Sequence, residues 1–234
     1  MNKEEKQREI YNNLTKYFSE LQFRINIYNK AKKETNVYLA SEFNVFDYIN
    51  PNENKLSDII ANLLDPNGTH GQKDIFLKEF LNIIDKKIDY NLMECRILRE
   101  DSTTYIQNNK RRIDITMNFE NKFEIGIENK PWDKEQENQL QDYQKHLRKK
   151  YGENFCIIYI SDYGSEPESL SEDLKQQLLK ENKLIILKYN LHIKKWLYQS
   201  YKECKSEKIR IFINDFIDYL YQNFENLYED LEEK

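Results

Sequence analysis

Two carboxylates and a lysine stand at the ends of two short apolar runs in the middle of this sequence. Asp114 interrupts the first run, and Glu128 and Lys130 follow directly on the second. Charged groups in apolar surroundings are costly unless they are paired or bind a metal. Two carboxylates supply the oxygen ligands that a hard divalent cation prefers, and a lysine beside them can steady a phosphate or help to deprotonate water. The three residues form a minimal set of groups for metal-assisted hydrolysis of a phosphodiester bond.

The spacing of these three residues is by itself a weak signal. Aspartate, glutamate and lysine are abundant in a chain that is 33% charged, so the same spacing arises easily by chance. On spacing alone, the favoured interpretation is an edge strand whose charges pair with one another. The surrounding sequence must therefore decide between a salt bridge and a catalytic site.

A β-hairpin is the element expected to position these groups. The apolar runs at residues 113–119 and 123–127 are separated by three polar residues, a usual length for a hairpin connection. Alternate residues of a strand share a face, so Glu128 and Lys130 should point the same way, with Asn129 opposite. The aspartate on the paired strand should reach the same end of the hairpin.

The chain before the hairpin is predicted to be helical. The first helix, over residues 3–31, carries an apolar stripe at alternating steps of three and four. The members of this stripe are Leu14, Phe18, Leu21, Ile25 and Tyr28. We expect the stripe to pack on the same chain, with a short coiled-coil seam as the alternative. A later helix begins near Asn52 and places Glu53 at the start of its buried face, either as part of a site or as a partner of the helix dipole.

The pattern from residue 96 onward predicts the order β-β-β-α-β-α-β-α-α. Asp133 is a plausible N-cap for the helix after the hairpin, and this helix should run to residue 151. Ser169 or Ser171 is the expected capping residue of a later helix. This order predicts an α/β fold with a mixed central β-sheet flanked by helices and an all-helical N-terminal third. We expect one domain over residues 1–234, made of a helical part (1–90), an α/β core (91–200) and a C-terminal helix with an acidic tail (201–234).

Composition and charge narrow the classes of protein. The net charge of −5 provides no overall basic field for nucleic acid, although a local patch would suffice. The three cysteines form no CxxC pair and the three histidines are isolated, which argues against zinc ligation and disulfides. Neither a signal peptide nor a membrane span is evident, so a cytoplasmic protein is expected.

Four blocks of sequence resemble the PD-(D/E)xK nuclease superfamily, whose core is restriction-endonuclease-like. They lie between residues 43 and 200, in the order found in that superfamily. The blocks are Glu53–Asn54 through Leu64–Asp65–Pro66, then His70–Gly71–Gln72, then Asp114 with Ile127–Glu128–Asn129–Lys130, and finally Gln139 with Tyr143. They are most similar to a bacterial branch with an IENK central motif followed by a QxxxY element.

This resemblance implies a role for each matched residue. Asp114 and Glu128 would be metal-binding acids, Lys130 the catalytic lysine, and the metal Mg²⁺ or Mn²⁺. The Asn129 carbonyl and Glu53 would complete the metal site. By the same resemblance, Gln139 and Tyr143 would line the site and contact the nucleic-acid strand; ordinary helix packing is the alternative.

The sequence departs from the family pattern at two positions. Ile113 replaces the proline of the PD motif, a change that the superfamily tolerates, and Leu56 stands where the branch leads us to expect a histidine. The second departure puts in doubt a polar group at that position and leaves the metal site unaffected.

Basic residues near the motifs suggest where a substrate would bind. Arg111 and Arg112, with Lys110, stand beside the aspartate, and four more basic residues follow Tyr143 along its helix: Lys145, Arg148, Lys149 and Lys150. They form either a local phosphate-binding patch or a solvated surface.

The leading hypothesis is therefore a metal-dependent nuclease, with DNA as the expected substrate and restriction or antiphage defence as the setting. The setting rests on family analogy alone. The alternatives are a non-catalytic nucleic-acid-binding module that keeps the fold, and an interaction subunit in a homo-oligomer or larger complex.

Overall fold

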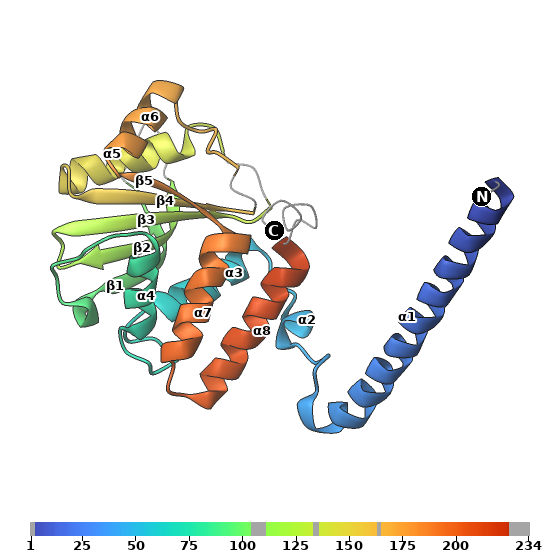
Figure 1. Ribbon diagram of the computed structural model, residues 1–234. Helices are drawn as coiled ribbons and strands as arrows, with labels where there is room; N and C mark the ends of the chain where they lie inside the picture. The colour runs from blue at the N-terminus through green and yellow to red at the C-terminus, as the bar shows by residue number, and fades with distance from the viewer. Residues whose placement is uncertain (1–2, 104–110, 133–135, 163–164, 225–234) are drawn as a thin grey trace. The chain divides into compact units, whose positions relative to one another are not determined.

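A computed structural model describes residues 3–103, 111–132, 136–162 and 165–224 of the chain (Figure 1). Contacts between residues divide the chain into two compact units, Met1–Phe43 and Asn44–Lys234. The sequence predicts one domain, whereas the contacts set the first helix apart. The predictions for Lys110, for Asp133 as an N-cap and for the acidic tail fall outside the described residues.

The first unit contains one long helix, α1 (Lys3–Leu39), which extends the predicted helix by two turns. In the described part of this unit α1 is the only helix or strand, so nothing within the unit covers its apolar stripe. The stripe is exposed; Phe18, for example, is 61% accessible and Ile25 42%. The expectation that the stripe packs on the same chain is not met within this unit.

The second unit is built on a five-stranded sheet in the order β1-β2-β3-β4-β5. Its strands are β1 (Arg96–Ser102), β2 (Arg112–Phe119), β3 (Phe123–Lys130), β4 (Phe155–Ser161) and β5 (Leu184–Lys188). The first three strands are antiparallel neighbours, and β3, β4 and β5 are parallel. The predicted mixed sheet is confirmed, because the hairpin supplies the antiparallel part and the crossover helices supply the parallel part.

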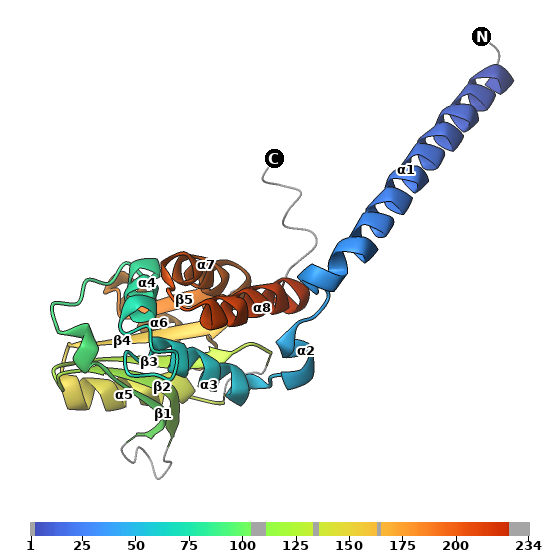
Figure 2. The same ribbon diagram turned by 90° about the horizontal axis from the view of Figure 1, so that it is seen from below.

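Helices cover both faces of this sheet. They are α2 (Val45–Ile49), α3 (Glu53–Leu64), α4 (Ile75–Ile83), α5 (Gln139–Tyr151), α6 (Glu172–Lys180), α7 (Lys194–Glu203) and α8 (Glu207–Phe224), with short turns at Leu92–Glu94 and Tyr189–Ile193. Figure 1 shows α5 and α6 on the opposite side of the sheet from α7 and α8, and Figure 2 shows α7 and α8 side by side. The all-helical N-terminal third is confirmed.

Strand alternation divides the core into two clusters. In β4, Cys156, Ile158 and Ile160 join the larger cluster with α3, α4, α7 and α8. Phe155, Ile157 and Tyr159 join the smaller cluster with α5 and α6. The all-apolar sequence of β4 reflects this position, since a central parallel strand is buried on both faces.

Helix α5 starts later than predicted, and α6 starts after the second of its two predicted capping residues. Helix α5 begins at Gln139, several residues after the predicted start, with Asn138 in the left-handed region at φ 59°. Ser169 does not cap the helix that follows it; its hydroxyl accepts the Leu140 backbone N–H at 2.9 Å, and Ser171 stands at the start of α6. The first turn of a helix leaves backbone N–H groups without helical partners, and Ser169 satisfies one of them for α5.

Candidate active site

Strands β2 and β3 form the predicted hairpin, and they separate where the candidate site lies. Their pairing runs from Phe119 opposite Phe123 to Ile115 opposite Ile127. Beyond that pair, the carboxylate of Asp114 accepts the Asn129 backbone N–H at 2.9 Å. A side chain thus takes the place of a ladder bond.

The core confirms that β2 turns at this point. Ile115 belongs to the larger cluster, whereas Ile113 packs with Tyr143 and Leu147 of α5 in the smaller one. Residues two apart in a regular strand would share a face. The change of face at Asp114 brings its carboxylate toward the end of β3. Burial raises the pKa of Asp114, while the Asn129 N–H and the charge of Lys130 oppose that rise.

Glu128 is fully buried, and three side chains contact its carboxylate. Gln139 Nε2 donates to Oε1 at 2.6 Å, the Tyr143 hydroxyl lies 2.8 Å from Oε2, and Lys130 Nζ lies 3.0 Å from Oε1. Burial and the nearby charge of Asp114 raise the pKa of Glu128 to about 8, against the opposing effect of Lys130. The carboxyl group is therefore held close to the border between its protonated and ionised forms at neutral pH.

The contacts of the Tyr143 hydroxyl also indicate that Glu128 can carry a proton. It contacts both the Arg112 carbonyl oxygen and Glu128 Oε2, and it accepts a hydrogen bond from Gln139 Nε2 at 3.0 Å. A hydroxyl has one proton to donate, so it satisfies one of these two acceptors. When it donates to the carbonyl, a proton on Glu128 completes the remaining contact.

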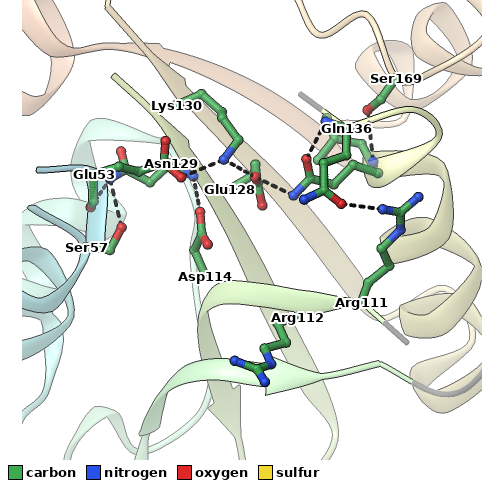
Figure 3. A network of polar contacts seen from close by, with 12 residues as sticks. Glu53, Ser57, Arg111, Arg112, Asp114, Glu128, Asn129, Lys130, Gln136 and Ser169 are labelled. Carbon is green, nitrogen blue, oxygen red and sulfur yellow. Dashed lines mark hydrogen bonds and ion pairs between the residues drawn. The ribbon is translucent and has the colours of Figure 1, made fainter. Parts of the chain in front are cut away.

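Lys130 Nζ lies between two carboxylates, 2.7 Å from Glu53 Oε1 and 3.0 Å from Glu128 Oε1 (Figure 3). Burial lowers the pKa of Lys130, but the charges of Glu128 and the hydrogen bond to Glu53 outweigh burial and the pKa is raised. The lysine is therefore held as a cation. This environment favours charge stabilisation of a phosphate over the alternative of deprotonating water.

Helix α3 delivers Glu53 to this cluster. The Asn52 side chain accepts the Lys55 backbone N–H at 2.9 Å and caps the helix, which begins at Glu53 as predicted. Glu53 meets Lys130 directly, so the structure places it as the partner of the lysine.

Gln139 and Tyr143 lie one helical turn apart on α5, and both are buried against the smaller core cluster, with Tyr143 1% exposed. Both hold Glu128 in place. Contact of either side chain with nucleic acid stays a prediction.

The two arginines that precede Asp114 have different surroundings. The Arg111 guanidinium donates to Asp142 Oδ2 at 3.1 Å, Gln136 Oε1 at 2.5 Å and the Glu137 carbonyl at 2.6 Å. Arg112 is exposed and pairs with Glu100 at 2.8 Å. Arg111 therefore ties β2 to the approach of α5, and Arg112 is the more accessible of the two to a phosphate. Of the other basic residues, Lys145, Lys149 and Lys150 are exposed and Arg148 is half-buried.

The donor atoms present suit a hard cation. Asp114, Glu128 and the Asn129 carbonyl would supply oxygen ligands, and Mg²⁺ commonly uses one or two carboxylates while keeping several waters. Within the described residues, no three histidine, cysteine, aspartate or glutamate side chains are arranged as a closed metal site. Lys130 lies between Glu53 and Glu128, so these two carboxylates face a lysine.

Three contacts in the site could not be predicted from the sequence. The Asn129 side chain donates to Ser57 and accepts from Tyr189, and Arg99 donates to the Asp114 carbonyl oxygen. Strand alternation predicts that Asn129 points away from Glu128, which is observed. Nothing in the hydrophobic pattern indicates which side chains it meets there. His70, in contrast, binds backbone at both ring nitrogens, as a turn residue would.

Comparisons with known proteins agree with this architecture. A model of the PD-(D/E)XK nuclease superfamily matches residues 43–218. Searches of the curated proteins and of the solved structures returned no match. No helix in the described ranges is long and apolar enough to cross a bilayer. The family match spans the five-stranded sheet, its helices up to the middle of α8 and the cluster around Lys130, and the chain belongs to the PD-(D/E)XK nuclease superfamily.

Proposed function

We propose that the chain is a divalent-metal-dependent nuclease that hydrolyses phosphodiester bonds of DNA. The observation that carries the proposal is the position of Lys130 Nζ between Glu53 and Glu128, at the point where β2 diverges to bring in Asp114. A simple salt bridge would need one carboxylate. Three carboxylates close to one buried lysine are costly to bury, and such clusters are typical of functional sites.

Each residue has a distinct role in this proposal. Asp114, Glu128 and the Asn129 carbonyl would hold Mg²⁺ or Mn²⁺. When bound, the cation would lower the pKa of a water molecule and offset charge at the scissile phosphate. Lys130 neutralises a phosphate oxygen, Glu53 orients that lysine, and Gln139 with Tyr143 orients Glu128.

The finer assignments follow from motif resemblance. The IENK run and the QxxxY spacing support a place in the bacterial branch that shares them, and restriction or antiphage defence is the setting that this branch suggests. Both are family analogy, which supports a setting less directly than it supports chemistry.

A cleavage assay tests the proposal. The full chain is incubated with Mg²⁺ or Mn²⁺ and linear, circular or single-stranded DNA, or RNA. We expect metal-dependent cleavage of DNA that Lys130→Ala and Asp114→Ala each reduce by about a thousandfold. Lys175→Ala is the matched control, because Lys175 is also buried between two glutamates, Glu166 and Glu172, but lies on α6. Cleavage that survives both site substitutions contradicts the assignment.

One observation favours the interaction subunit as a second candidate. Helix α1 exposes aromatic and aliphatic side chains along most of its length, and contiguous apolar surface often marks a binding surface. If the native chain forms a stable oligomer and binds DNA without cleaving it under any metal condition, this second function replaces the first.

A further inference from the structure

Asn129 separates the two charged residues of the site and is itself fully buried. Its side chain lies on the opposite face of β3 from Glu128 and Lys130, toward α3 (Figure 3). A buried amide must satisfy two N–H donors and a carbonyl acceptor. Where those bonds go therefore shows what this residue holds in place.

The amide nitrogen of Asn129 contacts the first two turns of α3. It donates to the Ser57 hydroxyl at 2.8 Å and lies 3.5 Å from the Glu53 backbone carbonyl oxygen. Residues four apart lie on one face of a helix, so both contacts fall on the side of α3 that faces β3. The first of these turns carries the Glu53 carboxylate that meets Lys130.

The amide oxygen of Asn129 binds the Tyr189 hydroxyl, which donates to it at 2.7 Å. Tyr189 is fully buried, and its ring stacks on Phe224 with centroids 4.5 Å apart. With the amide reversed, its oxygen would face the Glu53 carbonyl, and two acceptors repel. The two contacts together therefore determine the orientation of the amide.

Three segments far apart in the sequence meet at Asn129: the end of β3, the start of α3, and the turn after β5. We propose that Asn129, Ser57 and Tyr189 form a positioning unit that holds the first turn of α3 against β3, so that Glu53 reaches Lys130. None of the three side chains needs to touch substrate. The inference rests on the proposed function for its effect on rate, and on geometry alone for its effect on α3.

The Tyr189→Phe variant tests the unit with the smallest change. It keeps the stacked ring and removes the hydrogen bond to Asn129. We expect kcat to fall about tenfold, because a small displacement of a catalytic group reduces rate steeply, with KM for DNA changed less than about twofold. Backbone amides of residues 56–58 should exchange hydrogen faster, as measured by mass spectrometry. Ser57→Ala should act in the same direction from the other side of the amide.

Tyr219→Phe is the matched control. Tyr219 is a buried tyrosine whose ring also packs against Phe224, so its substitution removes a hydroxyl from the same aromatic cluster. We expect it to leave kcat and the exchange at residues 56–58 unchanged. If Tyr189→Phe and Ser57→Ala lower the melting temperature but leave both readouts as in the native chain, the positioning role is overturned.

The exchange measurement separates this inference from the proposed function. It needs neither metal nor cleavage, so it is decisive even if the native chain proves inactive. If the native chain does not cleave DNA but Tyr189→Phe speeds exchange at residues 56–58, the positioning unit is supported and the nuclease function is contradicted. Unchanged exchange in an active protein would do the reverse.

Discussion

Two glutamates on the same face of β3, Glu124 and Glu128, are both buried, and their neighbours are of the same kinds. Each carboxylate contacts a side-chain amide, a tyrosine of α5 and a lysine. For Glu124 these are Asn118 at 2.7 Å, Tyr151 at 2.5 Å and Lys150 at 3.7 Å. For Glu128 they are Gln139 at 2.6 Å, Tyr143 at 2.8 Å and Lys130 at 3.0 Å.

The difference between the two sites lies in their charges. The lysine beside Glu128 is shared with Glu53, and Asp114 lies near enough to raise the pKa of Glu128. The lysine beside Glu124 is half exposed. Hydrogen bonds are enough to accommodate one buried carboxyl group, as at Glu124. Where several acids surround one lysine, the protonation state of each acid depends on the charges of the others, so a bound cation or phosphate can change it.

The largest predicted difference is in activity. Glu128→Gln should reduce DNA cleavage by about a thousandfold, since it removes a ligand charge from the proposed metal site. Glu124→Gln should change the rate less than about threefold when measured on folded protein. A similar loss in both variants would show that the two glutamates do not differ in the way proposed here.

The next difference is in stability, and its sign depends on pH. The pKa of Glu128 is raised to about 8 in the folded chain, so the folded state holds its proton more tightly than the unfolded chain. Ionised Glu128 therefore costs stability increasingly from about pH 4.5 up to about pH 8. In metal-free buffer, Glu128→Gln should raise the melting temperature by about 3 °C at pH 8 and by little at pH 5.

Glu124→Gln should have the opposite effect on stability. Its carboxylate accepts from Asn118 and Tyr151, and an amide replaces one acceptor oxygen with a donor. We expect a loss of about 1–3 kcal/mol at pH 7, measured by urea unfolding. A stabilised Glu124→Gln, or a destabilised Glu128→Gln at pH 8, would contradict the contrast.

A smaller difference should separate the two tyrosines. Tyr143→Phe removes the hydroxyl that lies between Glu128 and the Arg112 carbonyl, and should reduce cleavage about tenfold. Tyr151→Phe should leave the rate within about twofold. Both should cost about 1 kcal/mol of stability, because each variant loses a hydrogen bond that the tyrosine hydroxyl donates. Equal rates in the two variants would remove Tyr143 from the site.

The smallest predicted effect concerns Lys150. The pair between its half-exposed side chain and Glu124 is long, so Lys150→Ala should change the free energy of unfolding by less than about 1 kcal/mol. The DNA affinity of Lys150→Ala, measured at several salt concentrations and compared with that of the native chain, tests whether this lysine binds phosphate. A clear drop in the salt dependence would show that Lys150 belongs to a phosphate-binding patch on α5.

Much of the fold follows from local patterns in the sequence. The apolar runs on either side of residues 120–122 predict the β2–β3 hairpin, and the all-apolar run at 155–161 predicts a central strand. Strand alternation predicts that Glu128 and Lys130 share a face and that Asn129 points away. These features are local, because side-chain direction in a strand repeats every two residues.

The parts that could not be predicted depend on contacts between distant segments. Glu53 and Lys130 are 77 residues apart, and Asn129 and Tyr189 are 60 apart. Hydrophobic periodicity shows which face of an element is buried but not which element covers it. For the same reason, the sequence predicts the stripe on α1 without indicating its partner. The late start of α5 was also missed, because one of its first backbone N–H groups is satisfied by Ser169, a residue that follows β4 in the sequence.

The sequence by itself determined Asp114, Glu128 and Lys130 as the candidate residues, the hairpin that carries them, and the shared direction of Glu128 and Lys130. Only the tertiary structure decided that Lys130 is shared by Glu53 and Glu128, and that Asp114 meets them where β2 leaves β3. The physical reason is that a charge in a core is tolerated or used according to its neighbours. Those neighbours come from α3, α5 and β2, which only packing brings together.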